Sequence, residues 1–258
     1  MGDDEVANEL GRSRPSAWIW VVLVFTIVSV SAVALLFVTA DDESLSPTAP
    51  GALSQMSADD VMTLARQKVA AKRSVRTLLT AREDDGETSV DLRWVRGKGF
   101  EFRQHKGALE SYVLCIDDTV YMKSNAVYWA QQLGASRARK AMKLLGNRFV
   151  KLPLSQTPYT PLRDMDPFAH LPTKGIQKIA SRTIDGIATV GIGDPTERPT
   201  SGRIYLADDG THLPVLLEIV DGSRTMKFTE WGQPVDLTVP RPSMAISSDE
   251  LQRQLAVG

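Results

Sequence analysis

The chain has 258 residues, enough for one domain with a sizeable hydrophobic core. Its 30 Lys and Arg against 31 Asp and Glu leave a formal net charge of −1, which argues against a nucleic-acid-binding surface. The one cysteine, Cys115, excludes an internal disulfide. Cys115 lies between Leu114 and Ile116 in an apolar run, which is typical of a buried structural thiol.

An apolar run near the N-terminus, Trp18–Val38, holds no charged residue, no Pro and no Gly. As a helix it spans about 31 Å, which matches the hydrocarbon core of a bilayer. Trp18 and Trp20 lie at one end, where indole rings favour the headgroup layer. We therefore expect residues 18–40 to form a transmembrane helix.

A cleavable signal peptide is the alternative interpretation of this segment. The sequence Val38-Thr39-Ala40 before Asp41 fits a cleavage site, but the apolar run is longer than the roughly 7–15 residues of a signal peptide. A lipoprotein signal needs a Cys just after the run, and none is present there. The sequence favours a permanent anchor and leaves cleavage open.

The charges that flank the segment orient it in the membrane. Arg12 and Arg14 precede it, and three acidic residues follow it at 41–43. Because Lys and Arg stay on the cytoplasmic side, residues 1–17 are expected to be a cytoplasmic tail. Residues 41–56 are a polar linker with two Pro and a Gly. We expect a single-pass protein of the cell membrane with an extracytoplasmic domain.

The rest of the chain predicts an α+β fold. Ser57 is the expected cap of a first helix that ends near Arg73. Further helices are expected at 126–134, at 136–145 with Ser136 as cap and Gly146 as end, and at 247–255. Period-two alternation with Gly and Asp turns predicts an antiparallel meander. Its expected strands are 75–81, 88–96, one beginning at Phe100, 111–116, 120–123, 148–153, 177–183, 186–192, 201–207, 213–220, 225–230 and 235–239.

Residue patterns that carry chemistry are scarce. The three histidines, His105, His170 and His212, have no metal-ligand spacing, and the acidic pairs occupy turns. A nucleophile elbow, a glycine-rich phosphate loop and a zinc-protease motif are all missing from the sequence. We therefore expect a protein that is not an enzyme, with no catalytic residue, metal site or cofactor.

One predicted helix, 136–145, would carry a basic face. Its members are Arg137, Arg139, Lys140 and Lys143. A solvated helix surface is the ordinary interpretation. The alternative is a patch that contacts anionic lipid headgroups or the phosphates of a glycolipid.

The C-terminal half carries a specific resemblance. The segments GRIYL at 202–206, LPV at 213–215 and FTEWGQPV at 228–235 follow SRTIDG at 181–186. This order of motifs resembles the closing strands of the LppX/LprA/LprF/LprG lipoproteins of actinobacteria and their LolA-like relatives. With the N-terminal helix and the meander, the resemblance covers roughly residues 57–240.

The resemblance implies a LolA-like half-barrel over 57–242, in which a curved antiparallel sheet has helices across its concave side, followed by a C-terminal tail at 243–258. In that family an apolar cavity between sheet and helices holds acylated lipids. Because this chain has no Cys for lipid attachment, the resemblance implies a carrier tethered at the outer face of the membrane.

Two functional hypotheses follow. The first is a membrane-anchored protein that binds or transfers a lipid, glycolipid or lipoglycan. The second is an envelope interaction or regulatory module of the same fold, with a protein partner. For the first, the expected cavity residues alternate along the strands. They are Leu92, Trp94, Phe100, Phe102, Tyr112, Leu114, Val120, Met122, Ile204, Leu206, Leu217 and Phe228.

Overall fold

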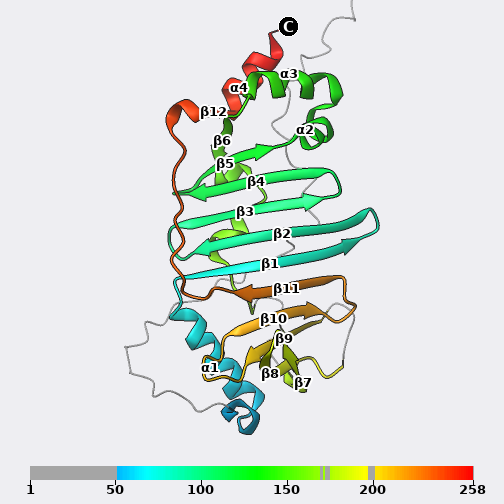
Figure 1. The fold of residues 1–258 in the computed structure, drawn as a ribbon, viewed down its shortest axis with the longest axis vertical. Helices are drawn as coiled ribbons and strands as arrows, with labels where there is room; N and C mark the ends of the chain where they lie inside the picture. Colours follow the sequence, from blue (N-terminus) through cyan, green and yellow to red (C-terminus); the bar gives the residue numbers. More distant parts are fainter. Residues whose placement is uncertain (1–50, 169–170, 172–174, 197–200, 258) are drawn as a thin grey trace, which may run out of the picture.

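The computed structural model describes residues 51–168, 171, 175–196 and 201–257 (Figure 1). The segment 18–40, predicted to cross the membrane, lies outside these residues together with the predicted tail at 1–17. Among the residues that the structure describes, no helix is both long and apolar enough to span a bilayer.

A single curved sheet forms the body of the described chain (Figure 1). Its twelve strands follow the order β12-β6-β5-β4-β3-β2-β1-β11-β10-β9-β8-β7, so the sheet does not close. All neighbours are antiparallel except β12 and β6. The strands are β1 Ser74–Glu83, β2 Gly86–Val95, β3 Gly99–Lys106, β4 Leu109–Ile116, β5 Thr119–Ser124, β6 Phe149–Pro153, β7 Gln177–Ile184, β8 Ile187–Gly193, β9 Gly202–Ala207, β10 Pro214–Ile219, β11 Arg224–Thr229 and β12 Ala245–Ser247. The expected curved and largely antiparallel sheet is confirmed.

Four α-helices accompany the sheet in the described residues: α1 Ala58–Ala70, α2 Ala126–Leu133, α3 Ala135–Leu145 and α4 Ser248–Ala256. Ser57 caps α1 as predicted, since its Oγ accepts from the amide of Asp60 at 3.2 Å. The prediction that Ser136 caps α3 is wrong, because Gly134 holds that position and Ser136 already lies in the first turn. The predicted end of α3 at Gly146 is confirmed.

The sheet has an inner face, which carries Leu92, Phe100 and Ile204, and an outer face, which carries Asp91 and Glu101. Two core clusters lie on the inner face. One joins β1–β6, β10 and β11 to α2, α3 and α4, and the other joins β8 and β9 to α1. The register Leu217↔Ile204 links the two clusters across the sheet. The helices therefore cover one face, as the half-barrel interpretation expects.

The C-terminal part of the chain differs most from the prediction. The strand expected at 235–239 is wrong, because this stretch makes no ladder and runs as an extended segment from β11 to β12 (Figure 1). Its Leu237 is buried on the outer face against Leu114 and Ile116. We call residues 231–241 the strap.

Residues after the strap are part of the same domain, although the sequence sets 243–258 apart as a tail. Strand β12 pairs in parallel with β6, and Ile246 is buried there. Helix α4 adds Leu251 and Leu255 to the cluster that contains Phe100. The end of the predicted linker also packs, since Leu53 is fully buried beside α1.

Turn residues set where the strands begin. Gly99 opens β3 with a φ of 144°, and a Cβ there would lie 1.9 Å from the carbonyl oxygen of Cys115. Only glycine fits so close to the neighbouring strand. Asp117 and Asp118, between β4 and β5, both have positive φ, which Asp tolerates better than most residues. These turns keep Phe100 and Val120 on the inner face.

Candidate functional site

The structure divides the twelve expected cavity residues between the two faces. Ten lie on the inner face, in the two core clusters: Leu92, Trp94, Phe100, Phe102, Val120, Met122, Ile204, Leu206, Leu217 and Phe228. Tyr112 and Leu114 lie on the outer face, because the register Leu114↔Tyr121 places them beside the strap. The structure therefore does not bring all twelve residues to one face, and the lipid cavity that they were expected to line stays a prediction.

Aromatic rings fill much of the inner face. Phe100 and Phe102 stack with their centroids 6.2 Å apart, and Phe102 meets Tyr159 edge-on at 5.1 Å. The indole of Trp94 donates to the carbonyl of Arg163 at 3.1 Å. These contacts tie the loop after β6 to the sheet. This part of the inner face is therefore a packed core.

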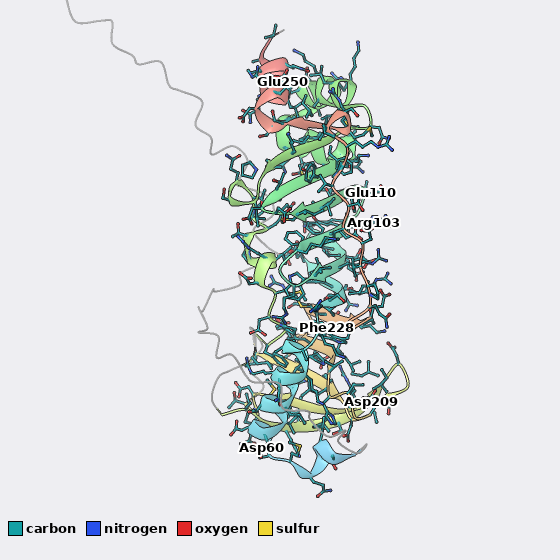
Figure 2. The ribbon with its side chains drawn as sticks, turned by 90° about the vertical axis from the view of Figure 1, so that its left-hand side faces the viewer. Asp60, Arg103, Glu110, Asp209, Phe228 and Glu250 are labelled. Atoms are coloured by element: carbon teal, nitrogen blue, oxygen red, sulfur yellow. The ribbon has the colours of Figure 1, made fainter. Side chains whose placement is uncertain are left out.

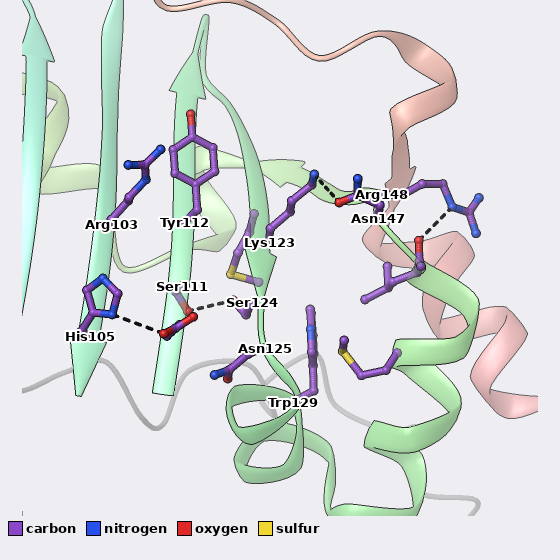
Figure 3. Close-up of a pocket in the computed structure, with 15 residues that line it drawn as sticks. Arg103, His105, Ser111, Tyr112, Lys123, Ser124, Asn125, Trp129, Asn147 and Arg148 are labelled. Carbon is purple, nitrogen blue, oxygen red and sulfur yellow. Dashed lines mark hydrogen bonds and ion pairs between the residues drawn. The ribbon is translucent and has the colours of Figure 1, made fainter. Parts of the chain in front are cut away.

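A pocket opens where β5 and β6 separate (Figure 3). Their ladder ends at Met122↔Val150, while β5 stays paired with β4 as far as Ser124↔Ser111. Helices α2 and α3 are inserted in the chain between the two strands and border the gap. The pocket has a volume of about 380 Å³, within the range of small-molecule sites.

Apolar side chains form the floor of this pocket. They are Met122 from β5, Trp129 from α2, and Met142 and Leu145 from α3. Trp129 is fully buried, and its ring meets Tyr128 edge-on at 5.2 Å. The hydroxyls of Ser111 and Ser124 lie 2.8 Å apart and hydrogen-bond to each other. The floor is therefore suited to an apolar group.

Polar and charged side chains form the mouth of the pocket. Lys123 Nζ donates to Asn147 Oδ1 at 2.9 Å and lies 4.3 Å from the centre of the Phe149 ring. Arg148 donates to the carbonyls of Leu144 and Leu145 at the end of α3. These side chains hold the α3–β6 corner in place.

The other side of the mouth comes from β3 and β4. Arg103 lies over the ring of Tyr112, 5.7 Å from its centre. His105 Nδ1 lies 3.8 Å from a carboxylate oxygen of Glu110. Figure 2 shows Arg103 and Glu110 on the same side of the sheet as the strap. The mouth therefore opens toward the outer face, and the floor reaches the core on the inner face.

Sequence reasoning found few of these lining residues. Of the twelve expected residues, Tyr112 and Met122 border the pocket. Trp129, Met142 and Leu145 come from α2 and α3, whose apolar sides were visible as helical patterns. Their convergence on the end of β5 depends on how the two helices pack, which no local pattern reports.

Burial favours the neutral forms of two side chains of β4, Tyr112 and Cys115. Burial, and then a 2.7 Å hydrogen bond to Glu101, raise the pKa of the Tyr112 hydroxyl. Burial raises the pKa of the Cys115 thiol to about 11, which keeps it protonated at neutral pH. The predicted burial of Cys115 is confirmed.

The basic residues predicted on one helix do not act as a single group. Lys140 Nζ donates to the carbonyls of Leu255 and Val257 and thereby ties α3 to α4. Arg137, Arg139 and Lys143 are exposed on α3. Their contact with anionic headgroups stays a prediction.

An open, curved antiparallel sheet with helices on one face gives the chain a half-barrel fold. The crystal structure of LprF from Mycobacterium bovis is similar at 15% identity, with a TM-score of 0.50, over 75% of this chain and 99% of that one. Lipoprotein LppX from Mycobacterium tuberculosis matches at 16% identity and a TM-score of 0.38, over 70% of this chain and 98% of that one. No protein-family model matches the chain, and no curated protein matches its sequence. The resemblance predicted from the motifs is thus confirmed at the level of the fold.

Proposed function

We propose that the domain is a non-enzymatic lipid-binding module that holds an acyl chain in the pocket between β5 and α3. The observation that carries this proposal is the pocket itself, with its apolar floor of Met122, Trp129, Met142 and Leu145. The LprF-like fold and the sequence motifs support it.

Apolar burial accounts for the affinity of such a site. Each methylene removed from water contributes about 0.8 kcal/mol, so several methylenes on the floor offset the cost of immobilising the lipid. No reactive group is needed for this.

We further propose that residues 18–40 tether the domain to the outer face of the cell membrane, where it receives or delivers lipid or lipoglycan. The apolar run and its flanking charges support the tether.

The test of the tether is protease treatment of intact cells. The proposal predicts digestion of residues after 56 and retention of a membrane-bound fragment. Release of the intact domain into the medium would instead establish cleavage.

Filling the floor of the pocket should remove lipid. Met142 is partly buried and borders the pocket, so the larger ring of Met142→Trp occupies space that is otherwise open. If the ring displaces two methylenes of the acyl chain from the pocket, binding of the lipid weakens about tenfold. Native mass spectrometry of the full chain from an actinobacterial host should show a smaller lipid-bound fraction, lower by up to about that factor.

The matched control is Met226→Trp, because Met226 is also partly buried on the inner face but does not border the pocket. It should keep the lipid-bound fraction of the wild type. Equal loss of lipid in both variants, or retention in Met142→Trp with unchanged thermal stability, would refute the pocket as the site.

A second candidate function rests on the edge of the sheet. Strand β7, Gln177–Ile184, ends the strand order and pairs with β8 alone among the strands that the structure describes. An edge of this kind accepts a strand from a partner protein. This favours an envelope interaction module. A pull-down that recovers one stoichiometric protein partner and no lipid would support it over the lipid proposal.

A further inference from the structure

The outer face of the sheet carries a network of ion pairs. Arg76 donates to both carboxylate oxygens of Asp91, at 2.8 and 2.9 Å. Farther along the face, Arg93 pairs with Glu101 at 3.1 Å and Arg182 pairs with Glu218 at 2.7 Å. Cations on this face are thus commonly neutralised by a carboxylate.

The cations at the mouth of the pocket differ from this pattern. Arg148 donates to the backbone carbonyls of Leu144 and Leu145. Within the described part of the chain, neither Arg103 nor Lys123 has a carboxylate within ion-pair distance. Lys123 contacts the amide oxygen of Asn147 and the ring of Phe149, and Arg103 contacts the ring of Tyr112.

The acidic groups nearest to these two cations are already engaged. Asp91 faces Arg103 in the strand register, but Arg76 occupies both of its oxygens. Glu101 accepts from Arg93 and from the hydroxyl of Tyr112. At the mouth itself, Glu110, beside His105, is the one carboxylate among the residues that line the pocket, against the three cations Arg103, Lys123 and Arg148. The mouth therefore keeps uncompensated positive charge.

The register places the two cations on either side of one residue. Arg103 pairs with Tyr112 on β4, and Tyr112 pairs with Lys123 on β5 (Figure 3). Their Cα atoms are therefore two strand spacings apart, about 10 Å. Both side chains are long enough to reach a phosphate between them. A guanidinium and an ammonium are the two cationic groups that proteins use for phosphate.

We propose that the pocket selects a lipid with a phosphate headgroup, held between Arg103 and Lys123 while the acyl chain lies on the floor. This inference rests on the proposed function, because the floor must first accept an acyl chain. It adds a chemical criterion to that function. A lipid that lacks the phosphate leaves both cations without an anionic partner.

The test compares two probes with the same acyl chains. Dioctanoyl phosphatidic acid carries the phosphate and dioctanoylglycerol lacks it, and each is titrated by calorimetry into the detergent-solubilised full chain. The wild type should prefer phosphatidic acid about tenfold or more, and the preference should shrink as salt rises. The double variant Arg103→Gln/Lys123→Gln should bind both probes with the affinity that the wild type has for dioctanoylglycerol.

The matched control is Lys151→Gln. Lys151 lies exposed on the outer face, on β6, but does not border the pocket. This variant should keep the preference. Circular dichroism checks that all variants fold.

The outcomes separate the two levels of the proposal. Equal affinity of the wild type for both probes, or a preference that survives in the double variant, overturns phosphate selection and leaves lipid binding intact. Failure of both probes to bind overturns the proposed function as well. Inorganic phosphate that competes as strongly as phosphatidic acid would identify a free phosphate site, and that result also overturns lipid selection.

Discussion

Deleting residues 243–258 should unfold the end of the domain that holds the pocket. The deletion removes Ile246, Leu251 and Leu255, all buried in the main cluster. Each buried side chain of this kind contributes about 1.5–3 kcal/mol, so the loss of roughly 5–9 kcal/mol approaches the whole stability of a typical domain. Thermal unfolding followed by circular dichroism should show no cooperative transition, or one at a much lower temperature than in the full chain.

Two single substitutions in α4 test the contribution of side-chain packing without removing any part of the chain. Leu251→Ala should lower the free energy of unfolding by about 2–5 kcal/mol, because Leu251 is fully buried. Its exposed neighbour gives the control, Gln252→Ala, with a change within about 0.5 kcal/mol. A cooperative, wild-type transition in the deleted chain would show that these residues are a tail after all.

Phe100→Ala should cost about 3–5 kcal/mol of stability. The ring is fully buried, stacks on Phe102 and lies among the residues that join β3 to α2 and α3. Phe100 was expected to line a lipid cavity, but it does not border the pocket. Urea unfolding should therefore show a lower midpoint with an unchanged slope, while lipid binding to the folded protein stays the same.

Phe149→Ala provides the same change of side chain on the outer face. Phe149 is half-buried under Lys123 and beside Tyr112, so its loss should cost clearly less than that of Phe100. Similar destabilisation by both substitutions would contradict the assignment of the core to the inner face. A change of lipid affinity in Phe100→Ala with little loss of stability would restore Phe100 as a cavity residue.

Local patterns predicted most elements because their causes are local. The Ser57 cap bonds three residues ahead, Gly146 ends α3 with a positive φ, and the Asp117-Asp118 turn lies between two adjacent strands. The failure at 235–239 has a cause that is distant in the chain. Val235 and Leu237 alternate like a strand, but their partners are side chains of β4, not a neighbouring backbone.

Alternation along a strand says which residues share a face, but not which face is covered. Leu114 and Cys115 are both apolar and both buried, yet one packs under the strap and the other under the helices. Sequence reasoning therefore could not tell that ten of the cavity candidates share the inner face while Tyr112 and Leu114 lie on the outer face. It had no means of knowing that the apolar strap covers the outer face there.

The sequence by itself determined the α+β class, the positions of most strands and turns, and a resemblance that the structure confirms at the level of the fold. These follow from side-chain periodicity and turn chemistry, which act over a few residues. Only the tertiary structure decided where the pocket lies and which cations remain unpaired at its mouth. The pocket exists because the β5–β6 ladder stops at Met122 while β4 and β5 continue, and because α2 and α3 border the gap. Both depend on contacts between segments that are distant in the chain.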